Sequence, residues 1–159
     1  MLESLSLDGK TIVVTGGGTG LGKEMVLAMT RSGADTVVAS RRTGPIEEVA
    51  SLARDLGKRS IAVSTDVTDS AQVERLFQAA LDEFGKVDVL FNNAGIVRGQ
   101  GGIPLWEVTD DEWRLGIDTN LTGAFYCSRA ISRHMVERGE GKIVNVSSGF
   151  GLRGGRDNY

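Results

Sequence analysis

Short apolar runs alternate with amphipathic segments along the chain. Five runs are rich in β-branched residues and almost continuously apolar, at 11–15, 36–40, 60–64, 87–91 and 142–146. Continuous apolar runs of this length are typical of strands that are buried on both faces, as in a parallel sheet. The pattern therefore predicts a sheet that is covered on both sides.

The segments between these runs place apolar residues at helical spacing, and most of them stop at a glycine. The first expected helix has an apolar face of Leu21, Met25, Ala28 and Met29 and stops at Gly33, and the second opens at Gly44 and Pro45 and ends at Gly57. The third is capped by Asp69 and ends at Gly85. The fourth starts from a capping box of Thr109 and Glu112 and runs from about 110 to 138. Strands and helices that alternate in this way form βαβ units. We therefore predict an α/β fold, a doubly wound parallel sheet of the Rossmann type, in a single domain over 1–159.

Composition and charge exclude several classes of protein. The 159 residues include 18 Lys and Arg against 21 Asp and Glu, a formal net charge of −3, so a basic nucleic-acid-binding surface is not expected. No apolar run approaches the roughly 18 residues of a membrane span, and the first residues do not resemble a secretory signal. The only cysteine, Cys127, is expected in the core, and the only histidine, His134, on the surface of the long helix. The expectation is a cytoplasmic protein without a metal site.

Glycine is unusually frequent, with 22 residues, and the densest group follows the first apolar run. Segment 15–22 reads TGGGTGLG and opens the first predicted helix. A glycine-rich turn between a strand and a helix lets backbone N–H groups approach a pyrophosphate at the helix N-terminus. The strict G-x-G-x-x-G fingerprint is not met, because Leu21 occupies its last glycine position, and the pattern is T-G-x-x-x-G-x-G instead.

This pattern resembles the cofactor turn of the short-chain dehydrogenase/reductase family, and four further segments resemble motifs of that family in the same order. They are the pair Asp66 and Val67, the N-N-A-G sequence at 92–95, Asn120 in the long helix, and Ser148, which begins an S-x-x-G sequence. The likeness extends from about position 8 to 159. It implies the strand order 3-2-1-4-5 in a sheet whose C-terminal strands are missing from this chain.

The resemblance also implies an activity, hydride transfer between a nicotinamide cofactor and a carbonyl or alcohol carbon. Ser148 would hydrogen-bond the substrate oxygen, and Asn120 would help to hold a water that relays protons. The residues expected to bind the cofactor are Gly16, Gly18, Thr19, Gly20, Leu21, Gly22, Ser40, Arg41, Arg42, Asp66, Val67, Asn93, Ala94 and Gly95.

The end of the second apolar run indicates which dinucleotide is bound. Enzymes that use NAD typically place Asp or Glu there to bind the ribose 2′-hydroxyl. This chain has Ser40, followed by Arg41 and Arg42. A carboxylate would repel a 2′-phosphate, whereas a hydroxyl and guanidinium groups attract it. We therefore expect NADP(H) in preference to NAD(H).

The likeness stops at the family's Y-x-x-x-K motif. The family's catalytic tyrosine usually lies about thirteen positions after the serine, which is two positions beyond Tyr159, the last residue. Tyr159 is either the catalytic residue on a shorter loop or a neighbour of it, and we favour the second. The lysine and the family's last two strands are absent, so we expect an incomplete domain that has little activity alone and an unpaired apolar edge at the fifth strand.

Three functions stay open. The leading one is an NADP(H)-dependent carbonyl reductase or alcohol dehydrogenase, similar to 3-oxoacyl reductases. The second is an enoyl- or dienoyl-thioester reductase, which the glycine turn and segment 39–41 also resemble, although Ser148 and the N-N-A-G sequence favour carbonyl chemistry. The third is a non-catalytic nucleotide-binding or interaction protein, if the natural chain ends at 159; Asn120 and Ser148 argue against it.

The expected partners are a small carbonyl or alcohol substrate and further copies of the chain. The long predicted helix is apolar on more than one face, with Trp113, Ile117, Leu121, Phe125, Cys127, Ile131 and Met135. In the family this helix packs against its counterpart in a homodimer or homotetramer. Burial against the chain's own sheet explains apolar residues equally well.

Overall fold

The fold is built around a parallel sheet with the strand order β3-β2-β1-β4-β5, which confirms the predicted order. The computed structural model describes residues 6–96 and 104–149. Within them the strands are β1 Thr11–Thr15, β2 Asp35–Ser40, β3 Ser60–Ser64, β4 Val89–Asn92 and β5 Lys142–Asn145. Residues Thr11 to Thr15 pair with β2 on one side, and Ile12 to Val14 pair with β4 on the other, so β1 is central.

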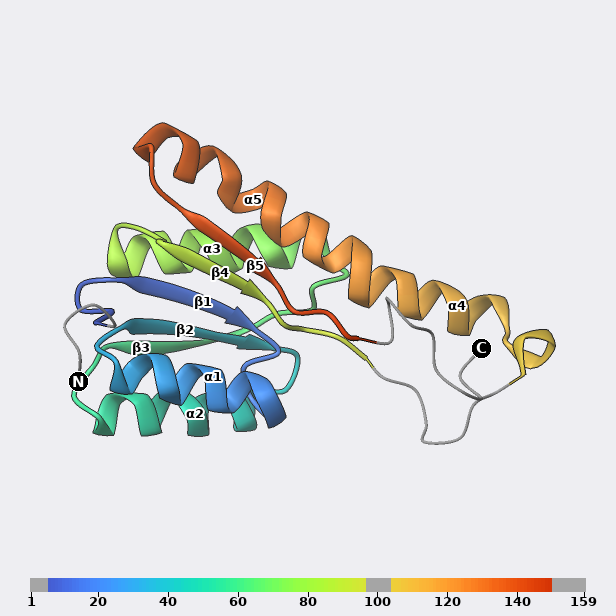
Figure 1. Cartoon of the computed structure of the whole chain (residues 1–159), viewed down its shortest axis with the longest axis horizontal. Coiled ribbons are helices and arrows are strands. Elements are labelled where there is room, and N and C mark those ends of the chain that lie inside the picture. The colour runs from blue at the N-terminus through green and yellow to red at the C-terminus, as the bar shows by residue number, and fades with distance from the viewer. Residues whose placement is uncertain (1–5, 97–103, 150–159) are drawn as a thin grey trace.

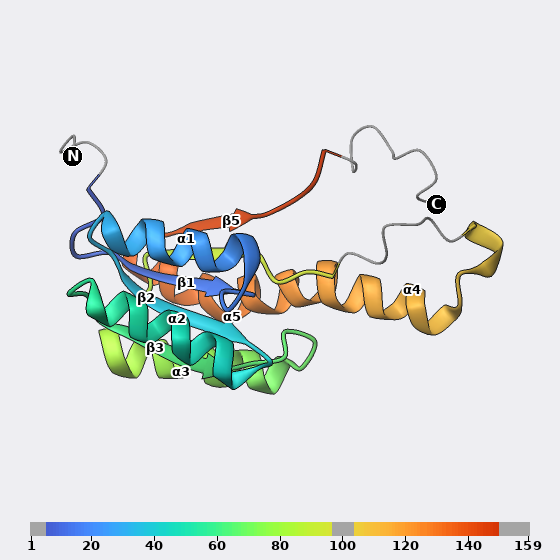
Figure 2. The same ribbon diagram turned by 90° about the horizontal axis from the view of Figure 1, so that it is seen from below.

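Helices cover both faces of the sheet. Their bounds are α1 Gly20–Arg31, α2 Thr43–Asp55, α3 Ser70–Phe84, α4 Asp110–Ile117 and α5 Gly123–Arg138. Helices α1 and α2 lie on one face, whereas α3 and α5 lie on the other (Figure 1). The view from below shows α4 continuing beyond the sheet, in line with α5 (Figure 2).

The central strands are buried on both sides because each face has its own apolar core. Val13 packs with residues of α3 and α5, whereas its neighbours Ile12 and Val14 pack with α1 and α2. All five residues of β1 are buried. Alternate residues that point to two cores explain the continuous apolar runs in the sequence. Cys127 is part of the first core, as predicted, and burial raises the pKa of its thiol to about 12.

The buried face of α1 differs from the predicted one. The residues turned to the sheet are Gly22, Val26, Leu27 and Thr30, whereas Leu21 is exposed. The Thr30 hydroxyl donates to the Val26 carbonyl at 2.8 Å, so this polar residue is satisfied inside the helix and can be buried. The prediction from apolar spacing was wrong because a glycine and a threonine hold two of the buried positions.

Helix α2 also begins one residue earlier than predicted, at Thr43. Pro45 therefore stands inside the first turn, where its missing N–H has no intrahelical acceptor to lose. The third helix confirms its predicted ends: the Asp69 carboxylate accepts hydrogen bonds from the N–H groups of Ala71 and Gln72, and Gly85 adopts a φ of 74°.

The predicted long helix is interrupted by a π turn, Asp118–Thr122, between α4 and α5. Its capping box is confirmed: the Thr109 hydroxyl accepts from the Glu112 N–H, and the Glu112 carboxylate accepts from the Thr109 N–H. Of the predicted apolar face, Cys127, Ile131 and Met135 are buried against the sheet. The others are not buried in the core: Ile117 is half-buried, and Trp113, Leu121 and Phe125 are 62%, 63% and 54% exposed.

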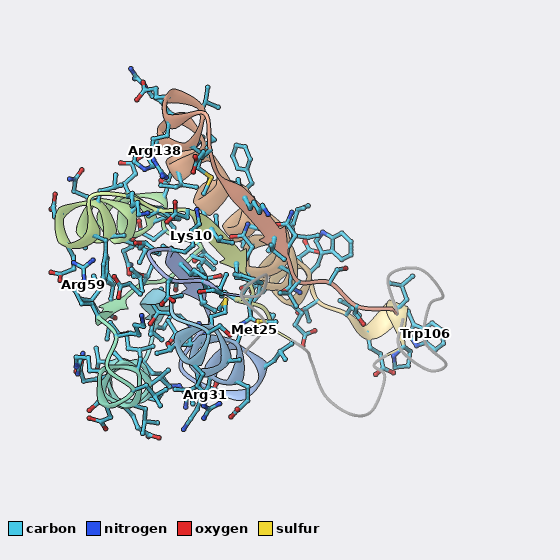
Figure 3. The ribbon with its side chains drawn as sticks, turned by 60° about the vertical axis from the view of Figure 1, so that its left-hand side comes forward. Lys10, Met25, Arg31, Arg59, Trp106 and Arg138 are labelled. Carbon is cyan, nitrogen blue, oxygen red and sulfur yellow. The ribbon has the colours of Figure 1, made fainter. Side chains whose placement is uncertain are left out.

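The start of β4 is shifted two residues from its prediction, and a buried charge explains the shift. Asp88 is 5% exposed, and its carboxylate takes the Thr11 N–H at 2.8 Å in place of a strand carbonyl. Arg138 and Lys86 pair with the same carboxylate at 3.0 and 3.2 Å. His134 is half-buried rather than exposed, and its Nε2 accepts a bond from the Val87 N–H at 3.4 Å. Figure 3 shows Arg138 at the end of α5, and Trp106 on the far side of the molecule.

Candidate functional site

A cleft of about 770 Å³ opens at the carboxyl ends of the strands. The loops after β1, β2, β3 and β4 contribute to it, together with the π turn. It lies beside the point where the strand order reverses, between β1 and β4, which is where open α/β sheets bind ligands. Every residue predicted to bind a cofactor lines this cleft except Gly18 and Gly20.

The glycine-rich turn brings bare backbone to the floor of the cleft. Gly16 has a φ of 66°, and a Cβ at this position would lie 2.9 Å from the Cα of Ala94. A Cβ on Gly22 would overlap the Gly16 carbonyl and lie 2.6 Å from the Asn93 amide. Helix α1 can therefore approach the ends of β1 and β4 only because these two residues are glycines.

The N-terminus of α1 is free to receive an anion. Thr19 is the N-cap residue but its side chain makes no capping bond, and the first turn has no acidic residue. The first N–H groups of a helix lack intrahelical acceptors and carry the positive end of the helix dipole. Thr19, Leu21 and Gly22 line the cleft at this point, so a phosphate group fits the donors that are present.

Gly18 and Gly20 lie away from the cleft lining. A Cβ at Gly18 would lie 3.0 Å from Ile46 and 3.2 Å from Pro45, so Gly18 packs against the start of α2. Gly20 has a φ of 54° with open space beside it, and it provides the backbone conformation that starts α1. Both glycines shape the turn from behind.

Thr15 ties the ends of β1 and β4 together. Its hydroxyl donates to the Phe91 carbonyl at 3.2 Å and accepts from the N–H groups of Asn93 and Ala94 at 3.1 and 3.0 Å. The Asn93 amide in turn donates to the carbonyls of Thr15 and Gly16 at 3.0 and 3.3 Å. This network holds the wall formed by 93–95 against the glycine turn.

The end of β2 places two cations at the rim of the cleft. Ser40, Arg41 and Arg42 line it, and both arginine side chains are exposed. Among the residues that the structure describes, no carboxylate pairs with either guanidinium. The Ser64 hydroxyl donates to the Arg41 carbonyl at 3.3 Å, which fixes the main chain there.

Asp66 and Val67 line the cleft just beyond the end of β3. One oxygen of the Asp66 carboxylate accepts from the N–H and the hydroxyl of Thr68, at 3.0 and 2.8 Å, which forms a turn into α3. Val67 is buried against Gly123, where an added Cβ would lie 2.6 Å from the valine side chain. Asp66 thus has the turn-capping role that its position permits, and it also borders the cleft.

Asn120 sits in the π turn and holds the loop that follows β4. Its Oδ1 accepts from the Ile96 N–H at 2.8 Å, and its Nδ2 donates to the Ile96 carbonyl at 3.2 Å. Both polar atoms of the amide are therefore engaged with the main chain of one residue. Ser148 follows β5, is exposed and does not line the cleft, and Tyr159 lies outside the described residues.

Three residues of the cleft lining were not predicted from the sequence: Thr65, Ile96 and Thr119. Ile96 and Thr119 adjoin predicted residues, and Thr65 directly precedes Asp66, so adjacency to the motifs was the available signal. Thr15 was part of the glycine motif, but nothing in the pattern indicated that its hydroxyl joins two strands.

No group of three or more His, Cys, Asp or Glu residues in 6–96 or 104–149 is arranged to hold a metal ion. No helix in the same ranges has the length and apolar character to cross a bilayer.

The comparison with known protein families decides the relationship. A sequence model of short chain dehydrogenases matches residues 10–158. The chain belongs to the short-chain dehydrogenase family. The 3-oxoacyl-[acyl-carrier-protein] reductase of Synechocystis sp. is 36% identical over 158 residues, which are 97% of this chain and 62% of that protein. The galactitol 2-dehydrogenase of Rhizobium johnstonii is 38% identical over 92% of this chain and 56% of its own length.

Solved structures of the family have the same fold. A short-chain type dehydrogenase/reductase from Mycobacterium marinum superposes with a TM-score of 0.88 at 33% identity, over 95% of this chain and 60% of that one. An NAD⁺-bound xylitol dehydrogenase superposes with a TM-score of 0.87 at 31% identity, over 93% and 56%. The chain thus spans less than two-thirds of the length of the relatives it matches.

Proposed function

We propose that this chain is the dinucleotide-binding part of an NADP(H)-dependent oxidoreductase that interconverts a carbonyl group and an alcohol. The observation that carries the proposal is the cleft, where an uncapped helix N-terminus, two tightly packed glycines and two exposed arginines face one space. NADP(H) needs this combination, since it carries a pyrophosphate in its middle and a 2′-phosphate on the ribose at the adenosine end.

The residues of the cleft divide into the parts that such a ligand needs. The N-terminus of α1 and the Gly16 turn would hold the pyrophosphate, and Asp66 and Val67 would contact the adenine. When bound, the nicotinamide supplies or accepts the hydride. The chain's own residues would position the nicotinamide. The wall at 93–95 is fixed by hydrogen bonds to Thr15, so this part of the binding surface is held in place by the protein itself.

Proton handling is proposed for Asn120 and Ser148. Since the Asn120 amide is already engaged with Ile96, we propose that the main chain of the π turn holds the relaying water. A π turn spaces its hydrogen bonds one residue wider than an α-helix, and such turns are frequent at functional sites. Ser148 would hydrogen-bond the substrate oxygen as negative charge develops on it. The tyrosine and lysine of the relay would follow the described residues.

Preference for NADP(H) is proposed from Ser40, Arg41 and Arg42. Guanidinium groups form strong bidentate bonds with a phosphate, and here no carboxylate competes for them within the described ranges. A protein with this fold, the xylitol dehydrogenase, has been solved bound to NAD⁺. The choice therefore depends on the residues at the end of β2 rather than on the fold.

The test is a change of the two residues at this strand end. In the double variant Ser40→Asp and Arg41→Ser, a new carboxylate faces the ribose and one cation is lost. We expect the ratio of NADPH to NADH affinity, measured by titration calorimetry, to fall by roughly tenfold or more, which is about 1.4 kcal/mol. The control Arg31→Ser removes a surface cation at the other end of α1. An unchanged ratio in the double variant would exclude Arg41 and Ser40 as the determinants.

Substrate assays distinguish the alternatives. The carbonyl reductase proposal predicts NADPH oxidation with 3-oxoacyl thioesters or simple ketones by the full-length protein, whereas an enoyl reductase would consume enoyl thioesters instead. Dinucleotide binding without turnover of either class would favour the non-catalytic function. The similarity to a 3-oxoacyl-[acyl-carrier-protein] reductase makes the first substrate class the one to try first.

Assembly into a homodimer or homotetramer is proposed for the full-length protein. The support is the surface of the long helix, where Leu121 and Phe125 remain 63% and 54% exposed. Large apolar side chains that share one helix face are typical of helix–helix interfaces between subunits. We propose a cytoplasmic location for the same protein.

A further inference from the structure

A buried asparagine at the end of β4 connects three elements around the candidate site. Asn92 is 5% exposed. Its Nδ2 lies 2.9 Å from the Oδ1 of Asn145 on β5, 3.0 Å from the hydroxyl of Ser128 on α5, and 3.3 Å from the Ala124 carbonyl on the same helix. One amide group therefore bridges two strands and a helix.

The bonding of this amide is unusual for a residue that only stabilises the fold. Its two N–H bonds are shared among three acceptors, and its buried Oδ1 accepts no hydrogen bond from the part of the chain described here. A buried oxygen without a donor costs stability, and an apolar side chain of similar size would avoid that cost. Such groups are found where position matters more than stability.

The bonds of Asn92 fix the segment that leads to Ser148. Asn92 and Asn145 are opposite one another in the β4–β5 register. The carbonyl of Asn92 also accepts from the Val146 N–H at 3.0 Å, so both the main chain and the side chain of Asn92 hold the carboxyl end of β5. Ser148 is only two residues beyond Val146. No helix or further strand stands between this anchor and the serine.

The same side chain fixes the helix that leads back to Asn120. Ala124 and Ser128 lie in the first two turns of α5, and α5 begins directly after the π turn that holds Asn120. The Ser128 hydroxyl donates to the Ala124 carbonyl at 2.7 Å, so it is oriented to accept from Asn92. On its own strand, Asn92 is followed by the wall of the cleft at 93–95.

We propose that Asn92 is a positioning residue that sets the distance between Ser148 and Asn120, and thereby controls the rate of the proposed reaction. The inference rests on the proposed function of these two residues. A positioning residue acts on the alignment of reacting groups, and misplacement by about 1 Å can lower a rate by roughly a hundredfold. The wall at 93–95 is also held by Thr15, and the N-terminus of α1 and the end of β2 make no contact with the Asn92 side chain, so dinucleotide affinity is expected to change much less than the rate.

The experiment compares variants in the full-length protein. Asn145→Ala removes the exposed partner, and Asn92→Ser shortens the bridging side chain. Each is expected to lower kcat by roughly tenfold or more while KM for NADPH changes less than about twofold. The double variant Asn92→Ser and Asn145→Ala should lower kcat little more than Asn92→Ser alone, because both changes break the same contact.

A matched control exists at the other edge of the sheet. Thr36 and Ser60 are opposite residues of β2 and β3 whose buried hydroxyls lie 2.9 Å apart. Thr36→Val removes this cross-strand bond far from Ser148, so it should lower Tm without lowering kcat. If kcat of Asn92→Ser and Asn145→Ala instead stays at the wild-type value while Tm falls as in Thr36→Val, the positioning role is wrong.

A second readout does not depend on activity. Amide NMR signals of Ser148 and Asn120 in the 159-residue chain should both shift in Asn145→Ala and neither should shift in Thr36→Val. If the wild-type protein reduces no carbonyl compound, the proposed function fails and these spectra still test the positioning. Unshifted signals at Ser148 in both Asn145→Ala and Asn92→Ser would overturn it.

Discussion

At the scale of single residues, the cleft depends on glycines, which have no side chain, as much as on the side chains that line it. Gly22 is not merely flexible: the Gly16 carbonyl and the Asn93 amide occupy the space that its side chain would need. The helix N-terminus and the wall at 93–95 meet there, so the packing of one glycine sets the width of the proposed pyrophosphate site.

A methyl group at this position should therefore affect both stability and binding. We expect Gly22→Ala to lower the free energy of unfolding by about 1–3 kcal/mol, because overpacking forces the backbone to move, and to weaken NADPH binding at least tenfold. Urea denaturation and a binding titration measure the two effects. Gly44→Ala is the matched control, since Gly44 has open space around it inside α2 and alanine favours a helix. Wild-type affinity in Gly22→Ala would contradict this account.

The sequence predicted most of these residues but not their bonds. Gly16, Gly22 and Asn93 line the cleft as expected from the motifs, whereas Gly18 and Gly20 do not. The two bonds between Asn120 and Ile96 could not be predicted, since they join residues 24 positions apart whose meeting depends on the π turn. A motif identifies a position, whereas the partner of a side chain is determined by tertiary packing.

At the scale of secondary-structure elements, the amino ends of the strands are held by charge and the carboxyl ends are left for a ligand. Burial by itself raises the pKa of the Asp88 carboxyl. The Thr11 N–H, Arg138 and Lys86 outweigh that effect and hold the pKa below its ordinary value of 3.8. Asp88 thus joins β1, β4 and the end of α5 at the edge opposite the cleft.

This arrangement predicts how stability responds to acid. Unfolded Asp88 binds a proton at its ordinary pKa, but the folded protein keeps the charge to a lower pH. Its contribution is therefore complete above pH 3.8 and is lost as the pH falls through the lowered pKa of the folded state. Urea titrations at a series of pH values should show this decline in the wild type and a weaker one in Asp88→Asn. The control Asp55→Asn removes an exposed carboxylate and should retain the decline of the wild type. Equal declines in both variants would contradict the assignment.

Removal of Arg138, which pairs with the Asp88 carboxylate, should also lower stability by a definite amount. Arg138→Met should lower the free energy of unfolding at neutral pH by about 2 kcal/mol, a typical value for a hydrogen bond to a charged group.

Element types were predictable because local patterns and tertiary structure agree over most of the chain. The capping box at Thr109 and the Asp69 cap are local signals, and both are confirmed. The π turn was not predicted, since the sequence on each side of it has ordinary helical spacing. The predicted buried face of α1 was wrong for a related reason: Thr30 is buried because its hydroxyl bonds a carbonyl of its own helix, and a threonine does not add to an apolar pattern.

At the scale of the whole molecule, β5 leaves apolar residues exposed at the edge of the sheet. Within the described ranges, β5 pairs only with β4, and its residues are exposed along the whole strand. Ile143, Val144 and Val146 are each more than one-third exposed. An edge strand with exposed apolar side chains, even a short one such as β5, is a template for pairing with other chains.

A charge on this edge should reduce self-association of the 159-residue chain. We expect Val144→Lys to lower the apparent mass measured by light scattering at high concentration, because lysine on an edge strand opposes strand pairing. Val136→Lys changes an equally apolar, more exposed residue on α5 and serves as the control. If the two variants behave alike, general solubility and not the strand edge is responsible.

The central claim is that the cleft of this family member binds a dinucleotide and selects the one with a 2′-phosphate. The most direct measurement is the pair of dissociation constants of the chain for NADPH and NADH, obtained by calorimetric titration at physiological ionic strength. We expect NADPH to bind at least about tenfold more tightly than NADH, with Arg41 and Arg42 as the source of the difference. Equal affinities, a preference for NADH, or no binding of either dinucleotide would contradict it.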